Sequence, residues 1–144
     1  MRFFLVFVLL FASSLTLFAE DGFPDDEMLP QEYKEEIVLE NNKSLHIAVK
    51  GQGVAPAFAI SPAQAYVLAK RAATVEAYRL IAERVNGVRV EGQDTIKNMV
   101  VKNTTIRANV SAMIKNAKVV ETTFKDGLCE VEMEITLNYN QFVQ

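Results

Sequence analysis

The last part of the chain carries a regular row of carboxylates. Glu130, Glu132 and Glu134 alternate with apolar residues, so on an extended strand they share one face and stand about 7 Å apart. Paired carboxylates can do acid–base chemistry or bind calcium, but calcium sites draw their oxygen ligands from several elements or from a tight loop. A regular row on one strand is more typical of a solvated face that discourages edge-to-edge pairing. We expect a solubilising surface here.

The chain has a single histidine and a single cysteine, which limits the sites it can build. His46 falls on the polar side of an alternating segment, and Cys129 falls on the apolar side of another, where it acts as a small apolar residue. Neither a metal site of the usual spacing nor an intrachain disulfide is therefore possible. No Ser-His-Asp arrangement is recognisable, and residues 51–53 lack the third glycine of a phosphate-binding loop. We expect no enzyme activity, no catalytic residue, no cofactor and no metal.

Basic residues gather in one stretch. Residues 95–120 contain no acid and five bases, here called the basic strip: Lys97, Lys102, Arg107, Lys115 and Lys118. No aromatic residues interleave the strip, and export would separate it from nucleic acid, so no nucleic-acid partner is expected. The strip is our candidate assembly surface.

Acidic residues gather before the predicted domain. Residues 20–40 hold nine acids against Lys34 alone, and Pro24 and Pro30 interrupt them. We interpret residues 20–40 as an acidic N-terminal arm, mobile over 20–35, followed by a single domain over 41–144. One hypothesis is that the arm engages the basic strip of the next subunit and steers head-to-tail assembly. The alternative is that both are solvated surface.

The first nineteen residues have the form of a secretory signal peptide. Arg2 supplies the positive start, residues 3–11 are an unbroken apolar run, and cleavage is expected after Ala19. A retained membrane anchor is the alternative, although a span needs about 20 apolar residues. The protein is therefore predicted to be exported, in the periplasm or associated with the outer membrane.

One long helix is predicted over residues 62–86. Ser61 and Pro62 are typical of a helix start, and Gln64 is placed to reach back to the N–H of the cap residue. The apolar stripe is rich in alanine, which lets the helix lie close to a sheet or another helix. Gly87 is expected to end the helix in a left-handed conformation.

Shorter elements surround this helix. Residues 45–50 alternate as a strand that the glycines at 51–53 break, and residues 88–90 open a second strand with Gly92 as a candidate bulge. Residues 104–115 fit a helix and a strand equally well. We choose a helix because of its length, with Asn116 closing it.

The C-terminal part predicts a β-hairpin. Residues 118–124 and 128–138 flank Asp126-Gly127, a strong hairpin-turn signal. The expected fold class is α+β: a small antiparallel or mixed sheet packed by one long Ala-rich helix and a shorter second helix, with a C-terminal β-hairpin.

A connected string of short motifs carries a family resemblance. They are GQG at 51–53, SPAQA at 61–65, LAKRAA at 68–73, AYRL at 77–80, VNGV at 85–88, AKVV at 117–120 and DG at 126–127. Together they resemble the LPP-twenty lipoprotein family, with its FlgP-like flagellar members, and the N-terminal domain of FlgT. The resemblance covers roughly residues 49–137. Each motif is weak alone, and the combination of the helix with the following NGV is fairly specific.

The resemblance implies an α+β domain that assembles at the outer membrane, in the flagellar members as part of a disk or ring around the motor. It implies no catalytic residue. Members of this type usually carry a lipid-modified cysteine after the signal, whereas here Ala19-Glu20 stands in its place. This departure favours a soluble periplasmic subunit that is held by partners.

We therefore expect a non-enzymatic structural or assembly protein of the cell envelope, of the flagellum-associated type required for motility. Its expected partners are further copies of itself and other envelope or flagellar proteins. The first alternative is a binding module for cell wall or lipopolysaccharide that uses the basic strip. A general outer-membrane surface antigen is another, and an exported hydrolase is disfavoured for want of a site.

Overall fold

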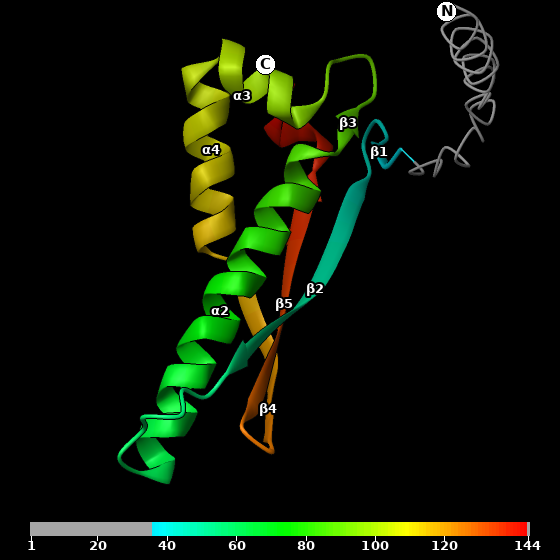
Figure 1. Cartoon of the computed structure of the whole chain (residues 1–144). Helices are drawn as coiled ribbons and strands as arrows, with labels where there is room; N and C mark the ends of the chain where they lie inside the picture. The colour runs from blue at the N-terminus through cyan, green and yellow to red at the C-terminus, as the bar shows by residue number, and fades with distance from the viewer. Residues whose placement is uncertain (1–35, 144) are drawn as a thin grey trace, which may run out of the picture. The chain divides into compact units, whose positions relative to one another are not determined.

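The computed structural model describes residues 36–143 of the 144-residue chain. The expected signal segment at 1–19 and residues 20–35 of the expected arm lie outside the described residues. Three strands form an antiparallel sheet in the order β2-β5-β4, namely β2 (Ser44–Val54), β5 (Leu128–Asn138) and β4 (Lys118–Lys125). The long helix α2 (Pro62–Asn86) crosses one face of β2 and β5, and α4 (Thr104–Lys115) stands beside it (Figure 1). The predicted fold class is confirmed.

Helix α2 begins and ends at the predicted residues, but both caps differ in detail from the prediction. The Ser61 hydroxyl accepts a hydrogen bond from the Gln64 N–H, as expected. The Gln64 side chain accepts from the Ile60 N–H at 2.7 Å instead of from the cap residue itself. Gly87 has φ −79°, so the expected left-handed stop is wrong. Its N–H still bonds the Glu83 carbonyl, which means that the helix ends without needing glycine's freedom.

The glycines at 51–53 do not break the first strand, contrary to the prediction. Strand β2 runs through them to Val54, and Gly51 and Gly53 face α2. A Cβ on Gly51 would overlap backbone atoms of Ala73 and Ala77, and one on Gly53 would overlap Ala69. Strand and helix meet here with almost no side chain between them, so the glycines allow close approach.

The C-terminal hairpin forms as predicted. Asp126 and Gly127 have φ values of 51° and 82°, the positive pair that a tight hairpin turn needs. The predicted core face of β5 is buried, with Cys129 at its start. However, β5 is the central strand. The carboxylate row therefore cannot protect a sheet edge, and that part of the expectation is wrong.

The N-terminal boundary of the domain lies earlier than residue 41. Val38–Leu39 form β1, which pairs in parallel with β3 (Arg89–Val90), and the Leu39 side chain is buried. The predicted second strand is thus only two residues long. Gly92 lies in the turn that follows it, with φ +73°, and is not a strand bulge.

Two short helices complete the described chain. Helix α4 matches the predicted residues 104–115 and is closed by Asn116, which resolves the ambiguity between helix and strand. The preceding helix α3 (Ile96–Lys102) was not anticipated; it begins at Thr95, whose hydroxyl accepts from the Asn98 N–H. A single 3-10 turn, η1 (Tyr139–Gln141), follows β5. None of the helices in residues 36–143 is long and apolar enough to span a membrane.

Candidate functional site

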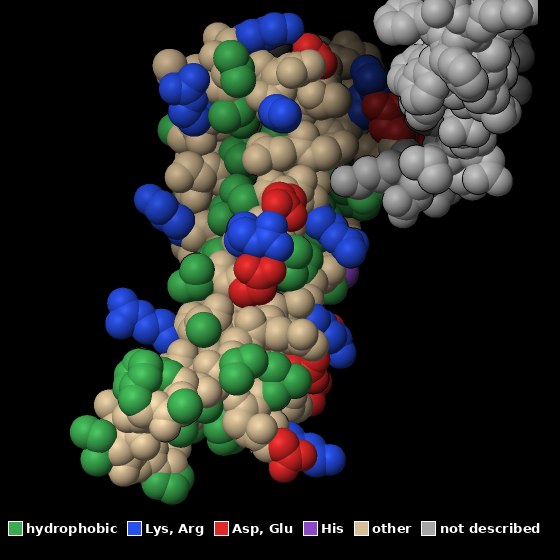
Figure 2. Space-filling view, in the orientation of Figure 1, with side chains coloured by type: hydrophobic (Ala, Val, Ile, Leu, Met, Phe, Trp, Pro, Cys, Tyr) green, Lys and Arg blue, Asp and Glu red, His purple; other side chains and the backbone are tan. Residues whose placement is uncertain are grey.

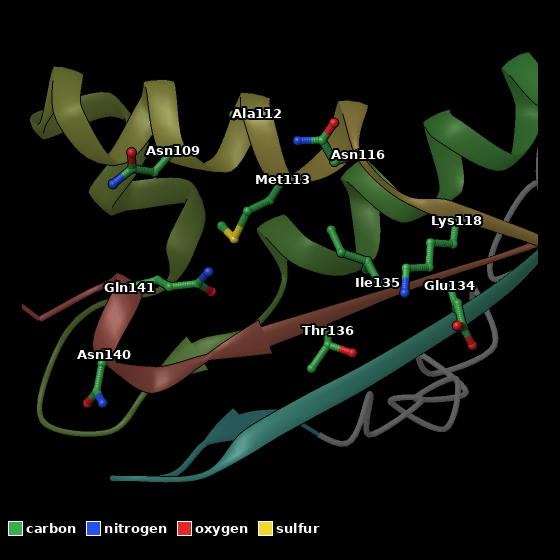
Figure 3. A pocket seen from close by; sticks show the side chains of 10 residues that line it. All are labelled: Asn109, Ala112, Met113, Asn116, Lys118, Glu134, Ile135, Thr136, Asn140 and Gln141. Carbon is green, nitrogen blue, oxygen red and sulfur yellow. The ribbon is translucent and has the colours of Figure 1, made fainter.

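A hollow of the described domain lies between α4 and the second half of β5 (Figure 3). We call it the α4–β5 groove, and its volume is about 640 Å³. Helix α4 supplies one wall, β5 supplies the floor, and η1 closes one end. The lining residues are Asn109, Ala112, Met113, Asn116, Lys118, Glu134, Ile135, Thr136, Asn140 and Gln141.

An exposed strand edge forms the floor of this groove. Strand β4 starts at Lys118, opposite Glu134, so β5 has no β4 residue beside it from Ile135 onwards. Strand β2, in contrast, pairs with β5 as far as Asn138. The last part of β5 is therefore paired on one side only.

The register shows which backbone groups face the open side. The Tyr139 N–H donates to Lys43 of the β2 side at 3.1 Å, and Ala55 donates to Gly127 at 2.7 Å. In an antiparallel ladder bonding direction alternates, so the odd-numbered residues of β5 bond to β2 and the even-numbered residues face away from it. The Asn138 N–H, on the open side, is bonded by the Gln141 side chain at 2.9 Å. The backbone N–H and C=O of Thr136 point into the groove.

The side chains around the open edge suit a peptide-like ligand. Met113 and Ile135 give an apolar contact, and Figure 3 shows Met113 projecting from α4 towards the floor. Among residues 36–143, the carboxamides of Asn109, Asn116 and Asn140 make no hydrogen bond. Each carboxamide offers both donors and an acceptor, as a peptide group does.

The basic strip is spread over α3, α4 and the start of β4. Lys102 bonds Asp94 at 2.9 Å, and Arg107 donates to the Val100 and Val101 carbonyls at 3.0 and 3.3 Å. Arg107 therefore ties α4 to the end of α3, while Lys102 reaches back along α3 to the residue that precedes its cap. Lys97 and Lys115 are exposed at distant points of the two helices, and Lys118 lines the groove. In Figure 2 the Lys and Arg side chains are scattered over the visible face and do not form one patch.

Several hydrogen bonds converge on one carboxylate at the start of α3. The Asp94 carboxylate accepts hydrogen bonds from the Asn98 side chain at 2.7 Å, from Lys102 and from the Thr95 N–H at 2.8 Å. The bond from Asn98 first, and then those from Lys102 and Thr95, lower the pKa of Asp94 to about 2. The carboxylate is half-buried and its partners all belong to α3 or its cap, so this is a local clamp on the helix start.

The carboxylate row lies on the sheet face away from α2, and β2 supplies its partners. Glu130 accepts from the Gln52 side chain at 2.7 Å, while Glu132 lies 3.3 Å from the Lys50 amine. Glu134 lies 3.4 Å from His46, which is exposed as predicted. Within residues 36–143 no group of three metal-ligating side chains is arranged to hold an ion. The row behaves as a paired, solvated surface.

Two acids of the expected arm are already engaged inside the domain. Glu36 lies 2.5 Å from Arg89, and Glu40 pairs with Lys43. Only residues 20–35 remain for the head-to-tail hypothesis.

Sequence reasoning missed the groove, because most of its residues are polar and they come from α4, the start of β4, β5 and η1. The one available signal was length: the strand predicted over 128–138 is longer than its partner over 118–124, so part of its edge had to stay open. No known protein-family model matches the chain, and no curated protein matches it either.

Proposed function

We propose that this chain is an exported structural protein of the cell envelope that assembles with copies of itself through the α4–β5 groove. The supporting observation is the open edge of β5 at Thr136, set in a groove of unpartnered carboxamides. An extended segment laid along such an edge gains main-chain hydrogen bonds, while neighbouring pockets select its side chains. The groove is a place where an assembly contact can form without rearranging the domain.

The segment proposed to occupy the groove is residues 20–35 of a neighbouring copy. This stretch directly precedes the folded domain and is strongly acidic. Lys118 lines the groove, and Lys115 occupies the last turn of the helix that forms its wall. Opposite charge would steer the arm to the groove and fix its direction.

Within this proposal, the flagellar role is the one that the LPP-twenty resemblance implies. The mixed α/β domain and the motif string at 51–88 are compatible with a disk or ring subunit around the motor. Cryo-tomography of motors in a strain lacking the gene, beside its complemented parent, tests this role. A disk or ring that disappears and returns supports it; intact motors contradict it and leave the assembly proposal standing.

Thr136→Pro tests the groove itself. The Thr136 N–H does not serve the β2 ladder, so proline removes a donor only from the open edge, the position where strands tolerate it. We expect the oligomers of the exported chain to dissociate in sedimentation velocity, and deletion of residues 20–35 should have the same effect. Thr136→Val keeps the N–H and should assemble normally. Oligomers of unchanged size in the proline and deletion variants, across salt concentrations, would refute the proposal.

A second candidate function is binding to an anionic envelope polymer such as cell wall or lipopolysaccharide. The observation that favours it is the exposure of Lys97 and Lys115, which make no ion pair within the described residues. A pull-down with purified cell wall compares the protein with its Lys97→Ala/Lys115→Ala variant. Retention that falls only in the variant supports this function, and absence of retention in both excludes wall binding.

A further inference from the structure

The loop that joins β2 to α2 makes one end of the domain strongly apolar. Phe58 is 80% exposed and Ile60 is 92% exposed, so both side chains project almost wholly into solvent. Val54 and Val67 flank them on β2 and α2 and are also exposed. We call these four residues the apolar tip. Figure 2 shows hydrophobic side chains gathered at this end, and Figure 1 places the loop at the opposite end of the domain from α3.

Hydrogen bonds define the conformation of the loop that carries the apolar tip. Ala59 donates to the Pro56 carbonyl at 3.2 Å, Ile60 donates to Gln64, and Ala55 donates to Gly127 of the hairpin turn. Pro56 and Pro62 have no N–H. Most backbone donors of the loop are therefore satisfied or absent, which lowers the penalty for moving it out of water.

The charged residues near the tip are placed as in proteins that bind a membrane surface, with cations behind an apolar end. No charged residue occurs between Lys50 and Lys70, and the first charges on α2 are Lys70 and Arg71. No acid precedes Glu76 on that helix. The α2 side of the tip thus presents apolar residues followed by cations about two turns further along the helix. The acids near this end, Asp126 and Glu130, belong to the hairpin.

The shape of the tip argues against a second copy as its occupant. A protruding Phe-Ile loop needs an apolar socket, and the α4–β5 groove pairs its apolar contact at Met113 and Ile135 with carboxamides and with the charges of Lys118 and Glu134. A lipid surface needs no socket, because acyl chains rearrange around an inserted side chain. Exposed apolar patches of this kind mark sites of protein or membrane contact.

We infer that the apolar tip inserts into an anionic lipid surface, with Lys70 and Arg71 at the level of the headgroups. Phe58 and Ile60 are the inserted side chains, and the cations add attraction to the headgroups. Burying one large apolar side chain strengthens partition by roughly tenfold or more. The inference does not depend on the proposed assembly function, since it uses the other end of the domain.

A fluorescent probe on the tip tests insertion directly. Ala57→Cys carries an environment-sensitive label at the exposed loop, and Cys129 is fully buried and does not compete for it. The protein is purified from the compartment to which it is exported and mixed with vesicles of phosphatidylglycerol and phosphatidylethanolamine. We expect a blue shift at position 57 and none from the same label on Gln93→Cys, in the turn at the opposite end.

Variants separate insertion from other contacts. Phe58→Ser/Ile60→Ser should weaken vesicle partition by roughly a hundredfold, since two apolar side chains are lost. Val101→Ser, at an exposed apolar position on α3, should leave partition unchanged. The inference is overturned if the label at 57 does not shift, or if the double variant partitions like the parent protein. A third outcome also overturns it: the parent protein does not bind vesicles, and the oligomers of the double variant dissociate in the absence of lipid. The tip would then contact another copy of the chain.

A last comparison keeps the two proposals apart. Thr136→Pro should leave vesicle partition unchanged even where it abolishes assembly, because the open edge of β5 lies in the other half of the domain. Loss of partition in that variant would show that lipid binding needs the oligomer and would overturn insertion by the single domain.

Discussion

Helix α2 packs directly on the sheet, whereas α4 packs on α2 and α3 and faces β5 across the groove. Helix α2 touches the strands through alanines, with Ala69, Ala73 and Ala77 completely buried against Gly51 and Gly53. Helix α4 points Met113 towards β5, while Asn109 and Asn116 line the wall of the groove, which stays open. One contact has no room for a methyl group, while the other holds about 640 Å³ of space.

The two contacts have different consequences: one stabilises the fold, and the other leaves surface exposed. Small residues let two backbones approach until their atoms touch, which gives a rigid contact without solvent. Larger polar residues on α4 cannot be buried without partners, so they keep that helix apart from the strand. Stability is concentrated at α2, and the surface available for a partner is at α4.

The largest loss of stability should come from placing a side chain between β2 and α2. Gly51→Val places a Cβ onto Ala73 and Ala77 backbone atoms, within 2.8 Å of the Ala77 Cα. Because neither the strand nor the helix backbone can yield locally, we expect a loss of about 3 kcal/mol or more in the free energy of unfolding. Urea denaturation followed by circular dichroism measures this loss.

Gly87→Ala is the matched control for that substitution. Gly87 has φ −79° and its nearest atoms lie at 3.5 Å, so alanine fits without strain. We expect stability to stay unchanged or to rise by about 0.4–1 kcal/mol, because alanine restricts the unfolded chain. Equal losses at positions 51 and 87 would contradict the close-contact account of α2.

A second pair of variants compares the two helices by truncating one side chain on each to alanine. Ile81 on α2 is fully buried, so Ile81→Ala should cost about 3 kcal/mol in unfolding free energy. Met113 on α4 borders the groove and is only partly buried, so Met113→Ala should cost less than about 1 kcal/mol. The same urea titrations measure both. Similar costs would mean that α4 is packed as tightly as α2.

Much of this architecture was predictable because local chemistry decides it. Ser61 and Pro62 start α2, alternation defines β5, and Asp126-Gly127 makes the turn. The errors arose where tertiary contacts override local preference. Gly51 and Gly53 weaken an isolated strand, yet the approach of α2 makes them necessary in this one. Leu39 belongs to the core, although acids flank the short apolar run in which it lies.

The candidate site was less predictable than the fold. The basic strip is continuous in sequence, but the structure assigns Lys102 and Arg107 to internal contacts and separates Lys97 from Lys115. The groove combines α4, β5 and η1, and no single one of these segments has a sequence pattern that predicts it. The apolar tip is visible in the sequence as an uncharged stretch, but only the structure shows that Phe58 and Ile60 project outwards.

The smallest predicted effect concerns the helix start that precedes α4. The pKa of Asp94 falls from 3.8 to about 2 on folding, because hydrogen bonds from Asn98, Lys102 and Thr95 favour the carboxylate. A lowered pKa adds stability above the unfolded value, and this stability is lost as the pH falls from about 4 to about 2. Asp94→Asn should therefore lower the melting temperature slightly at pH 7, and its difference from the parent protein should shrink towards pH 2, where half of the Asp94 carboxyls are protonated. Asp126→Asn removes the same charge at a turn that accepts Asn-Gly, so its melting temperature should follow the parent's. If Asp94→Asn is equally destabilising at pH 7 and pH 2, the carboxylate charge is not what holds the start of α3.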